Sequence, residues 1–399
     1  MIARVDAQRT VLDAVACLDT VRVERDDAYR CVLAADVVSS ENVPPFANSA
    51  VDGYAVTLAD MANGEAELVV AGTIAAGDAP TPNVTSGHAV RIMTGAPVPA
   101  GAEAIVMVED SQRIGDDRVK LTAKVEPNQA IRPAGDDVRK GDTVFRAGDE
   151  VNAAVMGMLA SMNVATVEVT RRPIVAVLST GDELVDDGSE LGPGQIRESN
   201  KTMLVRLVGE AGCDVVDYGI VRDDEGELEE VLRHAAQNCD AVVTSGGVSM
   251  GDYDVVKAVL GRIADMNWMQ IAIKPAKPFA FGKLNGTPIF GLPGNPVSSF
   301  VSFELFARPA LRKMAGHTQP QRPAVNVVAA APFNRKPDGK EHFARAVVTA
   351  NDGILTAVPV GAQGSHQLAA TALANALVVV PDGNSVAPGD TLQALLLSF

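Results

Sequence analysis

The chain has 399 residues, of which 47% are hydrophobic and 21% charged, and its net charge is −16. This length allows two to four domains with full cores, and the negative charge argues against nucleic acid as a partner, because phosphate binding requires a basic surface. The four cysteines and five histidines are scattered, so they form no zinc or redox motif. Charges at Arg4, Asp6 and Arg9 argue against a signal peptide, and no apolar run approaches the ~20 residues of a membrane helix. We expect a cytoplasmic protein with no membrane segment.

The first 172 residues predict a helical domain with a β-rich insertion. Helical spacing occurs in residues 5–18, 29–37 and 152–163. From Pro44 the chain is rich in glycine and proline and contains short strand-like runs at 68–70, 88–92, 104–108 and 118–121. We therefore predict a helical linker domain formed by residues 1–43 and 146–172, with residues 44–145 inserted into it as an elongated β domain.

The next part of the chain alternates between strand and helix patterns. Strands are predicted at 174–178, 214–219, 240–244, 269–273, 279–282 and 288–290, and helices at 200–210, 226–236, 254–260 and 297–314. Such alternation predicts a three-layer α/β domain over residues 173–317 with a mostly parallel sheet, whose ligands bind at the carboxyl ends of the strands. Strand patterns at 324–329, 343–349, 354–359, 376–380 and 391–397 then predict a C-terminal β-barrel-like domain over residues 318–399.

Three glycine- and proline-rich turns follow predicted strands of the α/β domain. They are Ser245-Gly246-Gly247-Val248-Ser249-Met250-Gly251, Lys274-Pro275-Ala276-Lys277-Pro278 and Gly291-Leu292-Pro293-Gly294-Asn295-Pro296. Small-residue turns leave backbone N–H groups free to hold anions, and two lysines in one turn add positive charge. Ordinary surface lysines and a simple capped turn are the alternatives. Together the turns indicate a phosphorylated or oxyanionic ligand, although they match neither the P-loop nor the dinucleotide fingerprint.

Carboxylates follow several of the same strands. They occur in Ser179-Thr180-Gly181-Asp182-Glu183-Leu184, in Asp223-Asp224, and at Asp252 and Asp254. Clustered carboxylates repel each other unless a cation lies between them, and Mg²⁺ held by carboxylates and substrate phosphates is a common arrangement. A solvated acidic surface is the alternative.

The inserted β domain carries a further polar group of residues. Asp52 lies in the turn Asn48–Ala55, Thr94 in Ile92–Pro97, and Asp137 in Ile131–Asp137. Loop and hairpin positions explain each of them equally well. They lie far in sequence from the α/β domain, so the residues alone do not connect them to its strand ends.

Taken in order, these strings resemble the molybdopterin molybdotransferases, a family that includes the C-terminal enzymatic domain of gephyrin. The resemblance is carried by the following segments: Ser49–Ala55, Ile92–Ala96, Arg132 with Gly135-Asp136-Asp137, Ser179–Leu184, Ser245–Gly251, Lys274–Pro278, Gly291–Ser298, Gly364–Leu368 and Ala374–Leu377. So many strings in one order are far more specific than any single motif.

The resemblance implies a homodimer whose active sites lie between the α/β domain of one subunit and the β domain of the other. The helical domain would then take part in dimerisation. It also implies the joining of molybdate to adenylylated molybdopterin with release of AMP and with Mg²⁺ as the cation. It further implies transient contacts with molybdopterin adenylyltransferase and molybdoenzyme chaperones. Molybdate and tungstate stay open as alternatives.

Roles can be assigned to residues on this basis. The expected catalytic residues are Asp52, Thr94, Asp137, Glu183, Lys274 and Lys277. The expected substrate-binding residues are Thr180, Gly181, Asp182, Ser245, Gly246, Gly247, Ser249, Pro293, Asn295, Pro296 and Ser298. The expected metal ligands are Asp254, Asp223 and Asp224.

One position departs from the family pattern. Ala276 stands where the family commonly has glycine, and its methyl group could narrow the ligand's approach or disfavour positive φ; we expect it to be tolerated.

The α/β domain alone also resembles enzymes that adenylylate molybdopterin and a damaged-nucleotide hydrolase family. The β domains argue against adenylylation, and the clustered Asp, Glu and Lys residues argue against a non-catalytic pterin-binding scaffold.

Overall fold

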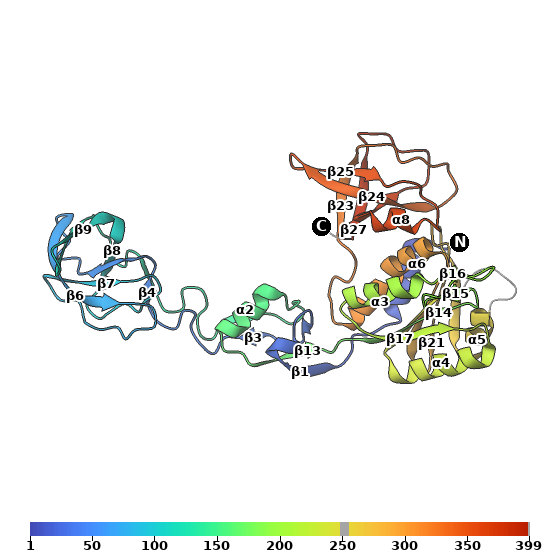
Figure 1. The fold of residues 1–399 in the computed structure, drawn as a ribbon, viewed down its shortest axis with the longest axis horizontal. Coiled ribbons are helices and arrows are strands. Elements are labelled where there is room, and N and C mark those ends of the chain that lie inside the picture. The colour runs from blue at the N-terminus through green and yellow to red at the C-terminus, as the bar shows by residue number, and fades with distance from the viewer. Residues whose placement is uncertain (248–254, 398–399) are drawn as a thin grey trace.

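The structure is a computed structural model and describes residues 1–247 and 255–397. The chain forms an elongated molecule with three regions along its length (Figure 1). A β module lies at one end and a small mixed module lies in the middle. An α/β domain, with a C-terminal β domain packed above it, lies at the other end. The predicted multidomain α/β class is confirmed.

The N-terminal helix α1 (Arg4–Asp13) packs on the α/β domain. Its Ala7 and Val11 are fully buried in the same core as residues of α7 (Arg308–Met314) and the π-helical turn η3 (Phe303–Ala307). The helix predicted over 5–18 is present, but it is shorter.

The middle module combines one helix with short strands. Its three-stranded antiparallel sheet has the order β1-β13-β2, and α2 is capped by Asn152, whose side chain accepts hydrogen bonds from Ala154 and Val155. Its elements are β1 (Thr20–Glu24), β2 (Val32–Leu33), β3 (Val37–Val38), β12 (Thr143–Phe145), α2 (Ala153–Ser161) and β13 (Thr166–Thr170).

The helix predicted over residues 29–37 is wrong. The segment contains β2 and β3, and Arg30 has a φ of 65°, which is incompatible with a continuing right-handed helix. Val32 and Leu33 are both buried against β13 and the middle core, so their apolar pattern reflects strand pairing and not one face of a helix.

The inserted β module is built on a six-stranded sheet of order β8-β5-β7-β6-β10-β9, and all four predicted strands are present in it. Two apolar clusters are formed by alternate residues of these strands, one containing Val56 and Val106 and the other Ala55 and Ile105. A separate pair, β4 with β11, supports the adjoining loops. The strands are β4 (Asn48–Ser49), β5 (Gly53–Val56), β6 (Glu65–Ile74), β7 (His88–Ile92), β8 (Ala104–Met107), β9 (Ser111–Ile114), β10 (Arg118–Thr122) and β11 (Ile131–Arg132).

The α/β domain contains a six-stranded sheet of order β17-β14-β18-β22-β21-β19. The first four strands are parallel, and the last two are antiparallel to their neighbours. The predicted mostly parallel sheet is confirmed. The strands are β14 (Ile174–Thr180), β17 (Asp214–Val221), β18 (Ala241–Ser245), β19 (Asp265–Gln270), β21 (Pro278–Leu284) and β22 (Thr287–Leu292).

Helices cover both faces of this sheet, as the three-layer prediction requires (Figure 1). One core joins the sheet to α1, α3, α6 and α7, and the other joins it to α4 and α5. No helix in the described ranges has the length and apolar character needed to span a bilayer. The helices not yet delimited are α3 (Asn200–Glu210), α4 (Glu225–Asn238), α5 (Val255–Ile263) and α6 (Pro296–Ser302), and a small parallel pair is formed by β15 (Leu184–Val185) and β16 (Ile196–Arg197).

The C-terminal domain is a closed barrel of five strands, because β26 pairs with both β27 and β24. Its elements are β23 (Ala324–Ala329), β24 (Glu341–Asn351), β25 (Ile354–Pro359), α8 (Leu368–Ala372), β26 (Ala376–Val380) and β27 (Thr391–Leu396). The strand predicted at 269–273 is divided in the structure. Its first part ends β19, and β20 (Ile273–Lys274) pairs with β24 of the barrel.

Candidate active site

The predicted strand-end turns meet at one rim of the α/β sheet. The segments that begin at Ser179, Ser245 and Gly291 follow or end β14, β18 and β22, which are direct neighbours, whereas the lysine turn follows β20. The amide of Gly246 donates to the carbonyl of Leu292 at 3.1 Å, and that of Gly181 donates to the carbonyl of Val221 at 3.3 Å. Thr180 and Ser245 end their strands and are buried beneath this rim.

Two rim positions require glycine. Gly246 has a φ of +99°, and a Cβ atom there would lie 2.9 Å from Thr180 Oγ1 and 3.0 Å from its carbonyl oxygen. Gly181 has a φ of +144°, and its Cβ atom would collide with the Glu183 carboxylate. Both glycines therefore allow a close approach that a side chain would prevent.

Asn200, which sequence reasoning missed, joins two of the turns. Its Nδ2 donates to Ser245 Oγ at 2.8 Å and to the carbonyl of Gly294 at 2.6 Å. It is the first residue of α3, and no motif distinguishes it from an ordinary helix start. Its position under the rim becomes visible only when α3 is packed on the sheet.

The lysine turn, residues 274–278, presents two free ammonium groups. It is closed by the Ile271 amide, which donates to the Lys277 carbonyl at 2.8 Å. Lys274 and Lys277 are exposed, and neither forms an ion pair within the described part of the chain. Ala276 is buried and adopts a φ of 72°, so alanine is tolerated in the left-handed region. That conformation costs about 1–2 kcal/mol, and burial of the methyl group offsets about 0.8 kcal/mol of this cost.

A cavity of about 660 Å³, called here the lysine cavity, lies between the rim and the barrel. Six predicted site residues line it, namely Glu183, Lys274, Lys277, Pro293, Asn295 and Ser298. The barrel side contributes Lys340, Gln363, Gly364 and Ser365, to which sequence reasoning gave no role. The Val297 amide donates to the Ser365 carbonyl at 3.0 Å, so the two domains are joined directly beside the cavity.

A second cavity of about 640 Å³, called here the acidic cavity, is lined by residues that follow β14 and β17. The predicted residues Gly181, Asp182, Asp223 and Asp224 line it, together with Asp186 and Asp187. The Asp223 amide donates to Asp182 Oδ1 at 3.3 Å. Ten of the predicted site residues thus line one of these two cavities, six the lysine cavity and four the acidic cavity.

Two of the three aspartates predicted as metal ligands, Asp223 and Asp224, differ in their surroundings. Asp224 is the N-cap of α4 and accepts a hydrogen bond from the Glu227 amide at 2.8 Å, whereas no side-chain partner engages Asp223 in the described residues. Within residues 1–247 and 255–397, no three His, Cys, Asp or Glu side chains gather closely enough to hold a metal ion. The predicted ligand Asp254 and the predicted substrate contact Ser249 lie outside the described residues.

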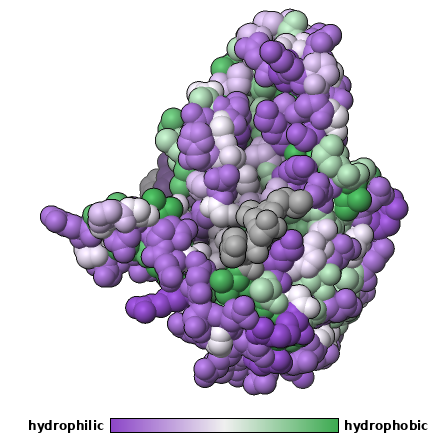
Figure 2. Space-filling view, turned by 90° about the vertical axis from the view of Figure 1, so that its right-hand side faces the viewer, coloured by the Kyte–Doolittle hydropathy of each residue, from purple (hydrophilic) through white to green (hydrophobic). Residues whose placement is uncertain are grey.

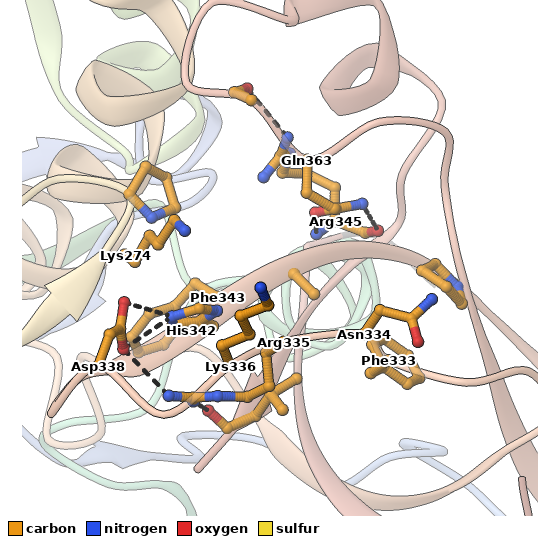
Figure 3. A pocket seen from close by; sticks show the side chains of 15 residues that line it. Lys274, Phe333, Asn334, Arg335, Lys336, Asp338, His342, Phe343, Arg345 and Gln363 are labelled. Atoms are coloured by element: carbon orange, nitrogen blue, oxygen red, sulfur yellow. Dashed lines mark hydrogen bonds and ion pairs between the residues drawn. The ribbon is translucent and has the colours of Figure 1, made fainter. Parts of the chain in front are cut away.

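A third cavity of about 490 Å³ extends into the barrel beyond Lys274 (Figure 3). Arg345, on its wall, is 1% exposed, and its guanidinium donates to the carbonyls of Ala362 and Gly364, at 3.3 and 3.1 Å. No described residue is a partner of its Nε, and burial lowers the pKa of the group. Sequence reasoning missed this arginine, because it stands in the alternating pattern of a barrel strand with no motif around it.

The arm formed by the inserted β module holds the other predicted catalytic residues. The Thr94 amide and hydroxyl both donate to Asp52 Oδ1, at 2.7 and 2.8 Å. These hydrogen bonds, with Arg91 nearby, hold the pKa of Asp52 below its ordinary value. Asp137 is exposed where the chain leaves the arm, and its amide donates to the Val43 carbonyl.

Within one chain the arm does not reach the rim. Figure 1 shows β4 and β7 at one end of the molecule and β14 at the other, with the middle module between them. The face that bears the α/β domain and the barrel is mostly hydrophilic, with small separate apolar areas (Figure 2). Asp52 and Thr94 therefore lie together, but apart from the lysine and acidic cavities.

Comparison with known proteins explains this architecture. Three family models match in succession: the MoeA N-terminal region (domain I and II) over residues 2–163, a probable molybdopterin binding domain over 176–313, and the MoeA C-terminal region (domain IV) over 326–397. A molybdopterin molybdenumtransferase of Haemophilus influenzae is 40% identical over 368 residues, which is 92% of this chain and 91% of that protein. The chain belongs to the molybdopterin molybdenumtransferase family.

Other members of the family support the same assignment. Molybdopterin molybdenumtransferase 2 of Mycobacterium tuberculosis is 41% identical over 397 residues, covering 97% of each chain. The crystal structure of a molybdopterin biosynthesis MoeA protein from Pyrococcus horikoshii matches with a TM-score of 0.82 and 30% identity, over 99% of this chain and 100% of that one. The resemblance inferred from the ordered motifs is confirmed, including the arm and the barrel.

Proposed function

We propose that this protein joins molybdate to adenylylated molybdopterin, forming molybdenum cofactor and releasing AMP. The observation that carries the proposal is the lysine cavity at the rim of a molybdopterin-binding domain. Two ammonium groups that form no ion pair with any described residue line it together with a carboxylate. Both reactants are anions, one a tetrahedral dianion and the other a pyrophosphate. Free ammonium groups stabilise such charge strongly in a partly enclosed site.

The residues divide the work between them. Lys274 and Lys277 hold oxyanion charge, and the amide of Gly247, with Asn295, holds phosphate oxygens, while Gly246 leaves room for their close approach. Glu183 lies in the same cavity, where it would take protons from the dithiol of molybdopterin and pass them to the oxo groups that leave molybdenum as water. The remaining predicted contacts, Thr180, Asp182, Ser245, Pro293, Pro296 and Ser298, shape the rim around the substrate.

Mg²⁺ prefers carboxylate oxygens, and several carboxylates line the acidic cavity. Because no three of the described ones converge on one point, substrate phosphates would have to supply further ligands. We assign Asp223 to it in preference to Asp224, whose oxygen already caps α4. When bound, Mg²⁺ would polarise the pyrophosphate of the substrate. Asp254 would complete this site.

We also propose that the working form is a homodimer in which the arm of one subunit reaches the rim of the other. Two observations support it. Thr94 hydrogen-bonds the Asp52 carboxylate and lowers its pKa, so the carboxylate is held ionised in one position. The arm, all of which is described, lies away from the cavities of its own chain. Asp52, Thr94 and Asp137 would then position molybdate or water.

Mixing two inactive variants tests the shared site. Asp52→Ala and Lys274→Ala should each lose AMP release, because each lacks one half of every site. If subunits reassociate at random, about half of the dimers are mixed and half of their sites are intact, so about a quarter of the wild-type rate should return. The measurement is molybdate-dependent AMP release from adenylylated molybdopterin. A mixture that stays inactive while mixed dimers form would show that the site is not shared.

The alternatives predict other outcomes in the same assay. An adenylyltransferase would consume ATP, and a scaffold would release no AMP; the match across the arm and the barrel argues against both.

We propose a cytoplasmic setting, supported by four cysteines that are all free in the structure. Transient contacts with molybdopterin adenylyltransferase and with molybdoenzyme chaperones complete the proposal.

A further inference from the structure

The strand that carries Lys274 belongs to the barrel rather than to the α/β sheet. β20 pairs in parallel with β24, with Ile273 opposite Glu341 and Lys274 opposite His342. The Glu341 amide also donates to the Ala272 carbonyl at 2.9 Å. Figure 3 shows Lys274 on the side of the barrel cavity where His342 and Asp338 lie. The position of the Lys274 ammonium group therefore depends on how β24 is held.

The N-terminus supports the same segment from the other side. Ile2 forms a parallel bridge with Ile271. Its amide donates to the Gln270 carbonyl at 2.8 Å, and its carbonyl accepts from the Ala272 amide at 2.9 Å. Because β20 has only two residues, these contacts supply much of the backbone pairing beside it.

A side-chain relay connects this N-terminal segment to β24. Arg4 donates to both carboxylate oxygens of Glu341, from Nε at 2.8 Å and from Nη2 at 3.4 Å, and its guanidinium lies 5.8 Å from the centre of the Phe343 ring. Arg4 Nη1 also donates to Gln8 at 3.0 Å, and Gln8 donates to the Leu305 carbonyl in η3 at 3.0 Å. The relay thus runs from the core of the α/β domain to the residue opposite Ile273.

We propose that Arg4 and Glu341 are positioning residues: their ion pair holds β24 against β20 and so sets where Lys274 presents its ammonium group in the lysine cavity. The inference rests on the role proposed above for Lys274. A partly exposed ion pair of this kind contributes only about 0–1 kcal/mol to stability. Its larger effect is on geometry, because a misplacement of about 1 Å can slow a reaction about 100-fold.

The test is a double-mutant cycle on the full-length dimer. Glu341→Gln removes the charge but keeps the size of the side chain, and it is made in the wild type and in Lys274→Ala. We expect kcat/KM for AMP release to fall about 10-fold in the wild-type background and to change less than about twofold in Lys274→Ala. Single-turnover measurements with excess enzyme keep the slow variants measurable. A purely structural role would lower kcat/KM equally in both backgrounds.

Two further variants separate positioning from folding. Arg4→Gln should reproduce the loss seen in Glu341→Gln, with no additional loss when the two are combined. Arg262→Gln is the matched control, because Arg262 forms ion pairs at 2.7 and 2.8 Å with Glu225 and Glu229 on the outer helices, and it should leave kcat/KM unchanged. Amide exchange at Ile271 should quicken in Glu341→Gln and not in Arg262→Gln.

The outcomes distinguish this inference from the proposed function. If Lys274→Ala alone keeps the wild-type rate, the role proposed for Lys274 is wrong. If Lys274→Ala is impaired while Glu341→Gln keeps wild-type kcat/KM, or lowers it equally in both backgrounds, the positioning inference is wrong and the proposed function stands.

Discussion

At the scale of single residues, backbone conformation decides where small residues are needed. Gly246 and Ala276 both adopt positive φ beside the lysine cavity, at 99° and 72°. A side chain at Gly246 would meet Thr180, whereas the methyl of Ala276 is buried in the apolar core. The family's glycine can therefore be replaced at position 276, while glycine at 246 is required.

Gly246→Ala should lower both activity and stability. The left-handed conformation alone costs about 1–2 kcal/mol, and the new methyl group would also displace Thr180 from the rim. Gly261→Ala is the matched control: Gly261 lies within α5 with open space around it, so alanine should stabilise the domain by about 0.5–1 kcal/mol. Chemical denaturation followed by fluorescence of Trp268, the single tryptophan, measures the stability of both variants, and AMP release measures their activity. Equal stability of the two variants would contradict the prediction.

At the scale of elements, helix ends limit which polar residues are free for chemistry. Asp224 and Asp223 are neighbours in sequence, and sequence reasoning gave them the same role. The structure separates them, because α4 begins directly after Asp224 and uses its carboxylate as a cap.

Substitution of the two aspartates should show this division. Asp224→Ser keeps a capping oxygen and should retain stability and activity, whereas Asp224→Ala should lose about 1 kcal/mol of stability and little activity. Asp223→Ala should lower the apparent Mg²⁺ affinity at least about 10-fold, as loss of a site residue typically does. Mg²⁺ titration of AMP release is the measurement. A serine variant at 224 that needs as much Mg²⁺ as Asp223→Ala would assign the metal to Asp224 instead.

At the scale of the whole molecule, polar contacts fix the middle module, which carries the arm, to the α/β domain. Arg171 forms a forked ion pair with Asp240, and Arg312 contacts Glu150 of the middle module at 3.1 Å. Arg312 also donates to His317 Nδ1 at 3.0 Å, which requires a neutral imidazole. Burial, together with Arg312, lowers the pKa of His317 to about 4 despite the nearby Glu150.

This junction should weaken in acid. Because the unfolded His317 has a pKa near its ordinary 6.5, the unfolded chain binds a proton first as the pH falls. The stabilisation from neutral His317 is complete above about pH 6.5 and is lost by about pH 4, a change of at most about 3 kcal/mol. Denaturation between pH 7 and pH 4 measures it, with His317→Asn as the comparison. The asparagine variant should show a shallower decline, and an unchanged slope would exclude His317 as the cause.

Much of the fold could be read from the sequence, because local patterns generate it. The strand and helix alternation of the α/β domain and the strands of the barrel follow from periodicity and turn chemistry, and within the described residues these elements are present apart from the strand at 269–273. The helix predicted over 29–37 is wrong, because pairing with β13 determines the structure of that segment. The strand predicted at 269–273 is divided, because its last residue belongs to β20, which pairs with β24.

The sequence alone determined the family, the chemistry of the rim and the identity of its lysines and acids, since these depend on residue types at short spacing. Only the tertiary structure decided that Arg345 and Ser365 lie beside the lysines, that Asp223 and Asp224 have different surroundings, and that Arg4 is linked to Lys274. The physical reason is that these relations join residues far apart in the chain, and such contacts arise from the packing of domains, which no local pattern encodes.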